Sequence, residues 1–267
     1  MPKLCANLSF LFTEQPMRER FAAAAAAGFG AVEFPSPYEH LDDYAERLLE
    51  HALHLVLFNL PMGDFAAGER GFALDPARRE EFHAGVERAL DAAHRLNCTR
   101  VNALVGIRKP ELDEQVMWQT AVENLRYAAS RLHEGGITLM VEPLNAIDTP
   151  NFFVETTARA LRLLDEVGAE NARLQFDCYH AQRGEGNLLA TFARNVGRIG
   201  HVQIADSPDR HQPGTGELAY ERILRAIDAA GYEGWVGLEY HPLGTTQESL
   251  SWIEAYGFEE IRGGAKA

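Results

Sequence analysis

Four short apolar runs in the second half of this chain end on side chains that could bind a cation. V-E-P-L-N offers Glu142 and Q-F-D-C-Y-H offers Asp177. H-V-Q-I-A-D offers Gln203 and Asp206, and L-E-Y-H-P offers Glu239. If the runs are neighbouring strands, carboxylates and an amide converge on one rim. Carboxylates so placed repel one another strongly unless a cation lies between them.

The ligand types indicate which cation this would be. Hard oxygen ligands without a thiolate suit Mg²⁺ or Mn²⁺. We therefore predict a divalent metal site formed by Glu142, Asp177, Gln203 and Glu239. The alternative for any one such acid is that it caps a loop or pairs with a surface arginine. Glu33, at the end of an earlier run, is assigned to that structural class.

Three further residues are candidates for binding a substrate. His180 follows Asp177 by three positions, which directs it toward the same mouth, although it could also be a satisfied loop histidine. Arg210 lies in S-P-D-R-H-Q-P-G-T-G-E, whose turn residues indicate an exposed loop. Arg70 lies in A-A-G-E-R-G, within a long glycine-containing loop at 62–76. For each arginine the alternative is an ordinary surface ion pair.

These side chains need a scaffold in which strands and helices alternate. Short β-rich runs predict the strands, and apolar spacing predicts the helices. The predicted strands cover 4–10, 31–34, 54–59, 100–105, 138–142, 173–176, 201–204 and 235–239. The predicted helices cover 17–27, 41–52, 79–96, 114–133, 157–167, 188–196, 220–230 and 247–255.

Eight strand–helix units in 267 residues predict an α/β fold, a (β/α)8 TIM barrel forming a single domain over residues 1–267. No G-x-G-x-x-G follows the first strand, which disfavours a dinucleotide-binding sheet. A faint internal echo links A-A-G-F-G-A-V-E-F with A-A-G-Y-E-G-W-V-G-L-E-Y, each a strand ending on Glu and then an aromatic residue. In such barrels the chemistry lies at the C-terminal ends of the strands, where the candidate ligands stand.

Composition excludes several classes of function. The net charge of −14 argues against nucleic acid, whose backbone is bound by clustered Lys and Arg. No run is long and apolar enough for a membrane helix, and M-P-K-L-C-A-N lacks the pattern of a signal sequence, so we expect a cytoplasmic protein. Three cysteines without C-x-x-C spacing indicate reduced thiols.

Over nearly its whole length the sequence resembles hydroxypyruvate isomerases, within the xylose-isomerase-like barrel superfamily. The motifs that carry this resemblance are A-N-L-S-F-L-F, N-L-P-M-G-D-F-A-A-G-E-R-G, V-E-N-L-R-Y-A-A, V-E-P-L-N, D-C-Y-H-A-Q, H-V-Q-I-A-D, P-G-T-G-E and G-W-V-G-L-E-Y. The resemblance implies that Glu142, Asp177, Gln203 and Glu239 bind a divalent ion, and that Glu142 and Glu239 also move protons. It also implies a homodimer or higher homo-oligomer.

Two positions refine this resemblance. Related keto-sugar epimerases tend to place His where Gln203 stands, so this Gln favours the isomerase branch. The E-Y-H-P motif departs from the isomerase pattern, because His241 stands where the resemblance predicts Lys.

The expected reaction interconverts hydroxypyruvate and tartronate semialdehyde through an enediolate. A metal would chelate the substrate oxygens, and two carboxylates would serve as base and acid. Three carboxylates and a divalent ion leave a net negative charge, so a small carboxylated hydroxy-oxo substrate needs a cationic partner. His180, Arg210 and Arg70 are the candidates.

Several alternatives stay open. A 2-oxo-tetronate isomerase or a keto-sugar 3-epimerase would use the same metal site. A metal-dependent endonuclease would need more metal-ligating His and a basic groove, which the charge of −14 disfavours. A non-catalytic sugar-binding barrel would be indicated by loss of a ligand, and none of the four ligands is lost.

Overall fold

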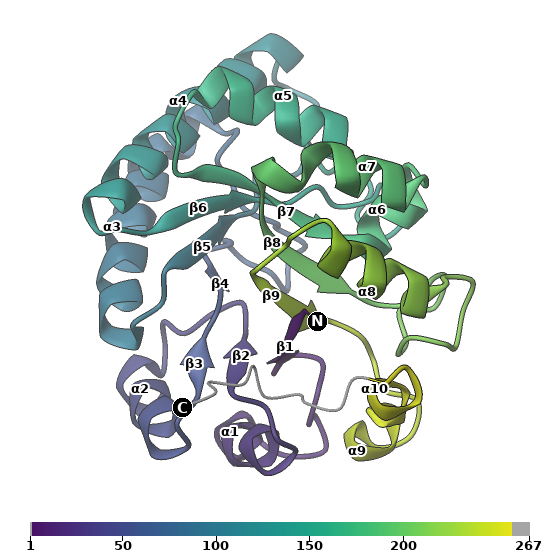
Figure 1. Cartoon of the computed structure of the whole chain (residues 1–267). Coiled ribbons are helices and arrows are strands. Elements are labelled where there is room, and N and C mark those ends of the chain that lie inside the picture. Colours follow the sequence, from purple (N-terminus) through teal and green to yellow (C-terminus); the bar gives the residue numbers. More distant parts are fainter. Residues whose placement is uncertain (1, 258–267) are drawn as a thin grey trace.

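In a computed structural model that describes residues 2–257, a ring of parallel strands is enclosed by helices (Figure 1). The predicted (β/α)8 barrel is confirmed. The strands are β1 (Lys3–Asn7), β2 (Ala31–Glu33), β3 (His54–Leu55), β4 (Phe58–Asn59), β5 (Arg100–Ala103), β6 (Thr138–Val141), β7 (Ala172–Asp177), β8 (Ile199–Ile204) and β9 (Trp235–Leu238). The prediction of one domain over 1–267 includes Met1 and 258–267, which lie outside the described residues.

The ring closes through the segment predicted as a single third strand, 54–59. The sheet order is β3-β2-β1-β9-β8-β7-β6-β5-β4. β3 pairs with β2 on one side and β4 pairs with β5 on the other. Only Val56 and Leu57 separate β3 from β4. The two short strands therefore occupy the third position in the barrel together, the first pairing with β2 and the second with β5.

The helices follow the predicted alternation, with two differences. They are α1 (Met17–Ala26), α2 (Leu41–Glu50), α3 (Arg79–Leu96), α4 (Glu114–Glu134), α5 (Thr157–Val167), α6 (Cys178–Gly184), α7 (Leu188–Asn195), α8 (Tyr220–Ala229), α9 (Thr246–Ser249) and α10 (Ser251–Ala255), with 3₁₀ turns η1 (Pro76–Arg78) and η2 (Val196–Arg198). The sequence did not predict α6, and the predicted last helix is two short ones. Among residues 2–257, no helix has the length and apolarity to cross a membrane.

The hydrophobic core lies between the ring of strands and the surrounding helices. On α3, for example, Val86, Ala89 and Ala93 are buried against the barrel. Successive residues of a strand face opposite sides. The other face of the strands therefore points into the barrel lumen, and there the buried residues include His201 and Gln203. Burying polar groups is costly unless they are hydrogen-bonded, so the lumen must hold a connected polar network.

Candidate active site

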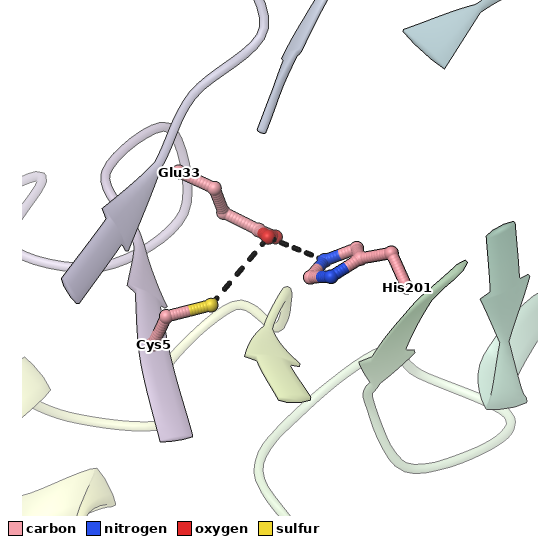
Figure 2. A group of neighbouring side chains, drawn as sticks. All are labelled: Cys5, Glu33 and His201. Atoms are coloured by element: carbon pink, nitrogen blue, oxygen red, sulfur yellow. Dashed lines mark hydrogen bonds and ion pairs between the residues drawn. The ribbon is translucent and has the colours of Figure 1, made fainter. Parts of the chain in front are cut away.

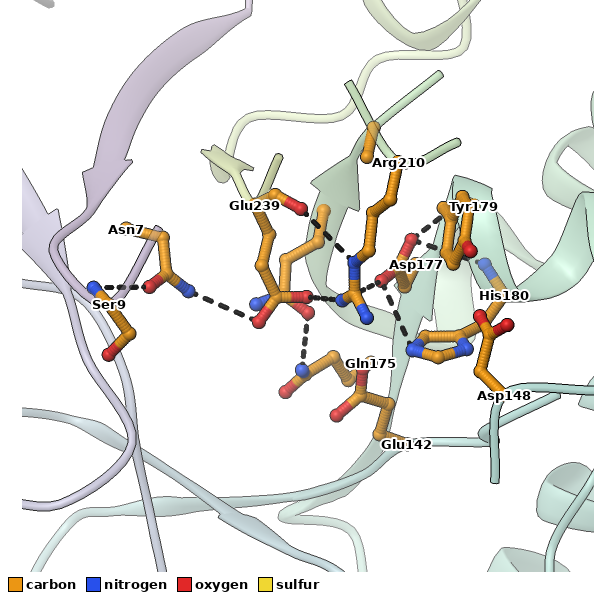
Figure 3. A network of polar contacts seen from close by, with 12 residues as sticks. Asn7, Ser9, Glu142, Asp148, Gln175, Asp177, Tyr179, His180, Arg210 and Glu239 are labelled. Atoms are coloured by element: carbon orange, nitrogen blue, oxygen red, sulfur yellow. Dashed lines mark hydrogen bonds and ion pairs between the residues drawn. The ribbon is translucent and has the colours of Figure 1, made fainter. Parts of the chain in front are cut away.

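The four predicted ligands stand at one rim of the barrel. Glu142 directly follows β6, Asp177 ends β7, Gln203 lies near the end of β8 and Glu239 directly follows β9. The parallel register sets Asp177 opposite Gln203. Glu142, Asp177 and Glu239 lie close enough for each to influence the charge of the others (Figure 3). The structure therefore brings together the strand ends that the sequence singles out.

Glu142 is held at the rim by the strand beside it. Pro143 follows and has no N–H to continue the sheet. Asn102 of β5 donates from Nδ2 to Oε2 of Glu142 at 3.1 Å. Burial and then the charge of Asp177 raise the pKa of Glu142 to about 8. A carboxyl group with such a pKa exchanges its proton near neutral pH, as a general base or acid must.

Asp177 has one oxygen that accepts hydrogen bonds and one that has only longer ion-pair contacts, to Arg210 at 3.6 Å and His180 at 3.8 Å. Its Oδ1 caps α6 by accepting the backbone N–H of Tyr179 at 2.7 Å and that of His180 at 3.4 Å. Its Oδ2 is buried and has no hydrogen-bond partner among the described residues. The cap therefore fixes the carboxylate in an orientation that leaves Oδ2 available to a ligand.

His180 lies against this oxygen as a neutral side chain. Its Nδ1 accepts the backbone N–H of Asn145 at 3.2 Å, which places the ring proton on Nε2, 3.8 Å from Oδ2 of Asp177. Burial lowers the pKa of His180 to about 4. The helix that follows β7 thus brings His180 to the mouth as predicted, but His180 contributes a hydrogen-bond donor rather than a positive charge.

Arg210 lies at the centre of the carboxylates. Its Nη2 is 2.6 Å from Oε2 of Glu239 and 3.6 Å from Oδ2 of Asp177 (Figure 3). The guanidinium lies over the rings of Phe10 and Tyr179, 4.9 Å from each centroid. Burial disfavours its charged form, but the surrounding carboxylates outweigh burial and raise the pKa of Arg210. Arg210 is therefore a permanent positive charge in the site.

The loop that carries Arg210 is built around Asp206. The carboxylate of Asp206 accepts backbone N–H groups from five loop residues: Ser207, Gly214, Thr215, Gly216 and Leu218. The sequence offered Asp206 as part of the rim, but both of its oxygens are engaged in holding the loop. Arg210 has a left-handed backbone (φ 59°), which this loop maintains.

Arg70 contacts its own loop. Its Nη1 donates to the carbonyl oxygens of Phe65 and Glu69 at 3.1 and 2.7 Å, and its guanidinium stacks on the Phe65 ring at 3.5 Å. These contacts lie within the segment between β4 and α3. Substrate binding by Arg70 stays a prediction.

The prediction that Glu33 caps a loop or pairs with a surface arginine is wrong. Its side chain is only 1% exposed and lies inside the barrel, where Asn7 and Gln203 both donate to it. Asn7 also donates to Oε1 of Glu239 at 3.2 Å. The signal that could have found Glu33 is the internal echo, because V-E-F in β2 repeats the L-E-Y that supplies Glu239.

The side chains at the rim fit a divalent cation. Carboxylate oxygens of Glu142 and Asp177 lie within 4.8 Å of each other, with the His180 ring beside them. Oδ2 of Asp177 pairs with Arg210 at 3.6 Å but has no hydrogen bond within the described residues, and burying a carboxylate oxygen without a hydrogen bond is costly. One guanidinium faces three carboxyl groups, and a divalent cation would offset their mutual repulsion when they ionise.

Comparisons with known proteins identify the family to which the chain belongs. The family model described as xylose isomerase-like TIM barrel matches residues 21–256. The chain is 44% identical to hydroxypyruvate isomerase of Escherichia coli (strain K12), covering 96% of this chain and 100% of that protein. It is 41% identical to 2-oxo-tetronate isomerase of Cupriavidus necator, covering 96% and 99%. A crystal structure described as AP endonuclease, family 2, from Brucella melitensis superposes with a TM-score of 0.93 at 45% identity, covering 96% and 99%.

Proposed function

This chain belongs to the xylose isomerase-like TIM barrel family, and we propose that it interconverts hydroxypyruvate and tartronate semialdehyde. The observation that carries the proposal is the contact of Arg210 with two carboxylates at a rim that also holds Glu142. This rim combines carboxyl groups that can exchange protons with the fixed positive charge of Arg210, which can bind the carboxylate of a small oxo-acid. The 44% identity to a relative named hydroxypyruvate isomerase supports the substrate.

The metal ligands in this proposal are Glu142, Asp177, Gln203 and Glu239, and the ion is Mg²⁺ or Mn²⁺. Oxygen donors favour these ions over soft metals. A bound ion would supply positive charge beside the substrate oxygens, which stabilises negative charge that develops during the reaction. The buried Oδ2 of Asp177, which has no hydrogen bond among the described residues, supports this ligand set.

Glu142 and Glu239 move the proton. One of them removes a proton from the hydroxymethyl carbon to form an enediolate, the hydroxyl proton passes from the oxygen of that carbon to the oxygen of the neighbouring carbon, and the other group returns a proton to the neighbouring carbon. Burial raises the pKa of Glu142 to about 8 and raises the pKa of Glu239 well above its usual value, which opposes the lowering of both pKa values that a bound divalent ion would cause. Positioned general acid–base catalysis of this kind contributes about 10²–10⁴-fold to a rate.

Arg210 holds the substrate carboxylate. Three carboxylates and a divalent ion leave one net negative charge, and the substrate adds another, so a fixed cation is needed beside them. Arg210 is the one of the three predicted partners that combines a permanent charge with a contact to the rim. The neutral His180 can donate a hydrogen bond from Nε2 to a bound oxygen.

A 2-oxo-tetronate isomerase is the second candidate, because the 41% identity to the Cupriavidus necator relative spans 96% of the chain. This substrate is one carbon longer and would use the same groups.

A keto-sugar 3-epimerase is less well supported, since Gln203 stands where those enzymes tend to place His. An endonuclease is opposed by the net charge of −14. A cytoplasmic location and a homo-oligomer complete the proposal.

The test is a substrate panel on metal-stripped protein with Mg²⁺ or Mn²⁺ restored. Hydroxypyruvate, 2-oxo-tetronate and D-fructose are compared by kcat/KM. We expect turnover only after a metal is added, with hydroxypyruvate preferred. Preference for 2-oxo-tetronate would move the assignment to the second candidate, and turnover of D-fructose alone would overturn both oxo-acid assignments.

A further inference from the structure

The carboxylate of Glu33 accepts hydrogen bonds from several buried side chains in the barrel lumen beneath the rim. Its Oε2 accepts from Nε2 of His201 at 2.6 Å and from the thiol of Cys5 at 3.6 Å (Figure 2). Its Oε1 accepts from Nε2 of Gln203 at 2.8 Å and from Nδ2 of Asn7 at 3.1 Å. Four side chains from β1 and β8 therefore donate to one carboxylate from β2.

Gly237 makes room for this carboxylate. Gly237 of β9 lies beside Cys5 of β1 and Gln203 of β8 in the sheet register. A Cβ atom at position 237 would lie 2.3 Å from Oε1 and 2.7 Å from Oε2 of Glu33. Both distances are too short for any side chain, so the glycine leaves the space through which Glu33 reaches across the barrel.

The carboxylate determines which way the amide of Gln203 faces. A carboxylate only accepts hydrogen bonds, so the Gln203 atom against it must be the NH₂ group. The amide oxygen of Gln203 then faces away from Glu33, and there it accepts from Nε2 of Gln175 at 2.6 Å. An amide oxygen has two lone pairs, so one remains for a further partner.

A second proposed ligand is reached through Asn7. The Nδ2 of Asn7 donates both to Oε1 of Glu33 and to Oε1 of Glu239. Its Oδ1 accepts the backbone N–H of Ser9 at 3.0 Å, so the orientation of the Asn7 amide is fixed as well. Glu33 thus contacts one proposed ligand directly and a second through a single side chain.

The Cys5, Glu33 and His201 atoms lie close enough to hold an ion themselves. Their contacts instead already pair donors with an acceptor. A metal would need the Cys5 thiolate, and burial, followed by the charge of Glu33, raises the pKa of Cys5 well above its usual value. The cluster is therefore a hydrogen-bonded support rather than a second metal centre.

We propose that Glu33 is a positioning residue, which turns the amide oxygen of Gln203 toward the metal site and, with Gly237, sets the affinity of the site for its ion. The inference rests on the ligand set given under the proposed function. Partners that orient metal ligands typically change metal affinity about 10–100-fold when removed, so Glu33 should affect binding on this scale although it touches no substrate.

The test uses Glu33→Ala, Gly237→Ala and the double variant of the full chain. Mn²⁺ affinity is measured by EPR titration, and stability by thermal unfolding. We expect each single variant to weaken Mn²⁺ binding at least about tenfold. In the double variant the methyl group at 237 enters the space left by Glu33, so the stability losses should not add, while Mn²⁺ binding stays weak.

The double variant therefore separates two roles of Glu33: filling space in the barrel lumen, which affects stability, and orienting Gln203, which affects Mn²⁺ affinity. Recovery of both stability and Mn²⁺ affinity in the double variant would overturn the proposal, as would wild-type affinity in either single variant. Cys5→Ser is the matched control, because it retains a donor to Glu33 and should keep wild-type affinity. If the wild-type protein itself fails to bind Mn²⁺, or Gln203→Ala binds it equally well, the proposed ligand set fails rather than the role of Glu33.

Discussion

Nη2 of Arg210 lies 2.6 Å from Oε2 of Glu239, so the loop after β8 places a permanent cation against the carboxylate that follows β9. The segments after β8 and β9 are also joined through the backbone, because His241 N–H donates to the Arg210 carbonyl at 2.8 Å. This pair connects the acid–base chemistry of the rim with recognition of an anionic substrate.

Replacing either proposed proton carrier should abolish most catalysis without unfolding the protein. Glu142→Gln and Glu239→Gln each retain an oxygen ligand but cannot accept and release the proton. We expect kcat to fall about 10²–10⁴-fold in each variant. Steady-state kinetics with metal in excess measure this, with circular dichroism to check the fold. Wild-type kcat in either variant would remove that residue from the mechanism.

Arg210→Met should weaken binding of a carboxylated substrate selectively. Losing a charge-assisted hydrogen bond costs about 1.5–3 kcal/mol, so KM for hydroxypyruvate should rise about 10–100-fold. Arg70→Met is the comparison, because Arg70 bonds to carbonyls of its own loop. An equal rise in KM for a neutral ketose, or a large effect at Arg70 alone, would refute the assignment of the clamp to Arg210.

Metal binding should stabilise the folded protein. A ligand at 100 times its Kd adds about 2.7 kcal/mol, which corresponds to a rise in Tm of about 5–10 °C for a chain of this size. Thermal scans of stripped protein with and without Mn²⁺ measure the shift. Asp177→Ala, which removes the oxygen that has no hydrogen bond, should lose most of this shift. A shift that persists in this variant would place the ion elsewhere.

The ion pair between α3 and α4 should give a pH-dependent contribution to stability. Hydrogen bonds from Arg131 and then Tyr127 lower the pKa of Glu87 to about 2. A carboxylate with a depressed folded pKa stabilises above its unfolded pKa of about 4.3 and loses that contribution as pH falls toward the folded value.

Glu87 is 42% exposed, so Glu87→Gln should cost at most about 1 kcal/mol at pH 7. Urea unfolding of both proteins at pH 7, 4.5 and 3.5 should show this difference shrinking as the pH falls. A difference that is constant, or that grows toward acid, would contradict the assignment.

Much of the fold follows from the sequence because each strand–helix unit carries its own local pattern. The placement of Glu142 and Glu239 at one rim follows too, since the C-terminal ends of parallel strands share an edge. The helix α6 was missed because it is only 7 residues long and begins within the ligand motif. The run at 54–59 reads as one strand, and only the closed barrel shows that it pairs in two pieces.

The support beneath the rim could not be predicted in the same way. Glu33 reaches Gln203 and His201 across 168–170 positions of sequence, and no local spacing encodes such contacts. Gly237 gives no signal in the sequence either, because only the structure shows that the Glu33 carboxylate occupies the space beside it. Long-range polar contacts inside a barrel depend on register and lumen width, which only the assembled sheet defines.

In the proposed reaction the rim moves a proton between two carbons of a small oxo-acid, whose oxygens a divalent ion would hold. Metal-stripped protein is mixed with hydroxypyruvate in D₂O and followed by proton NMR before and after Mg²⁺ or Mn²⁺ is added. We expect tartronate semialdehyde to appear only once metal is present, with deuterium on the carbon that receives the proton. Product formed without deuterium would contradict proton transfer, and no conversion of hydroxypyruvate with either metal would contradict the assigned reaction.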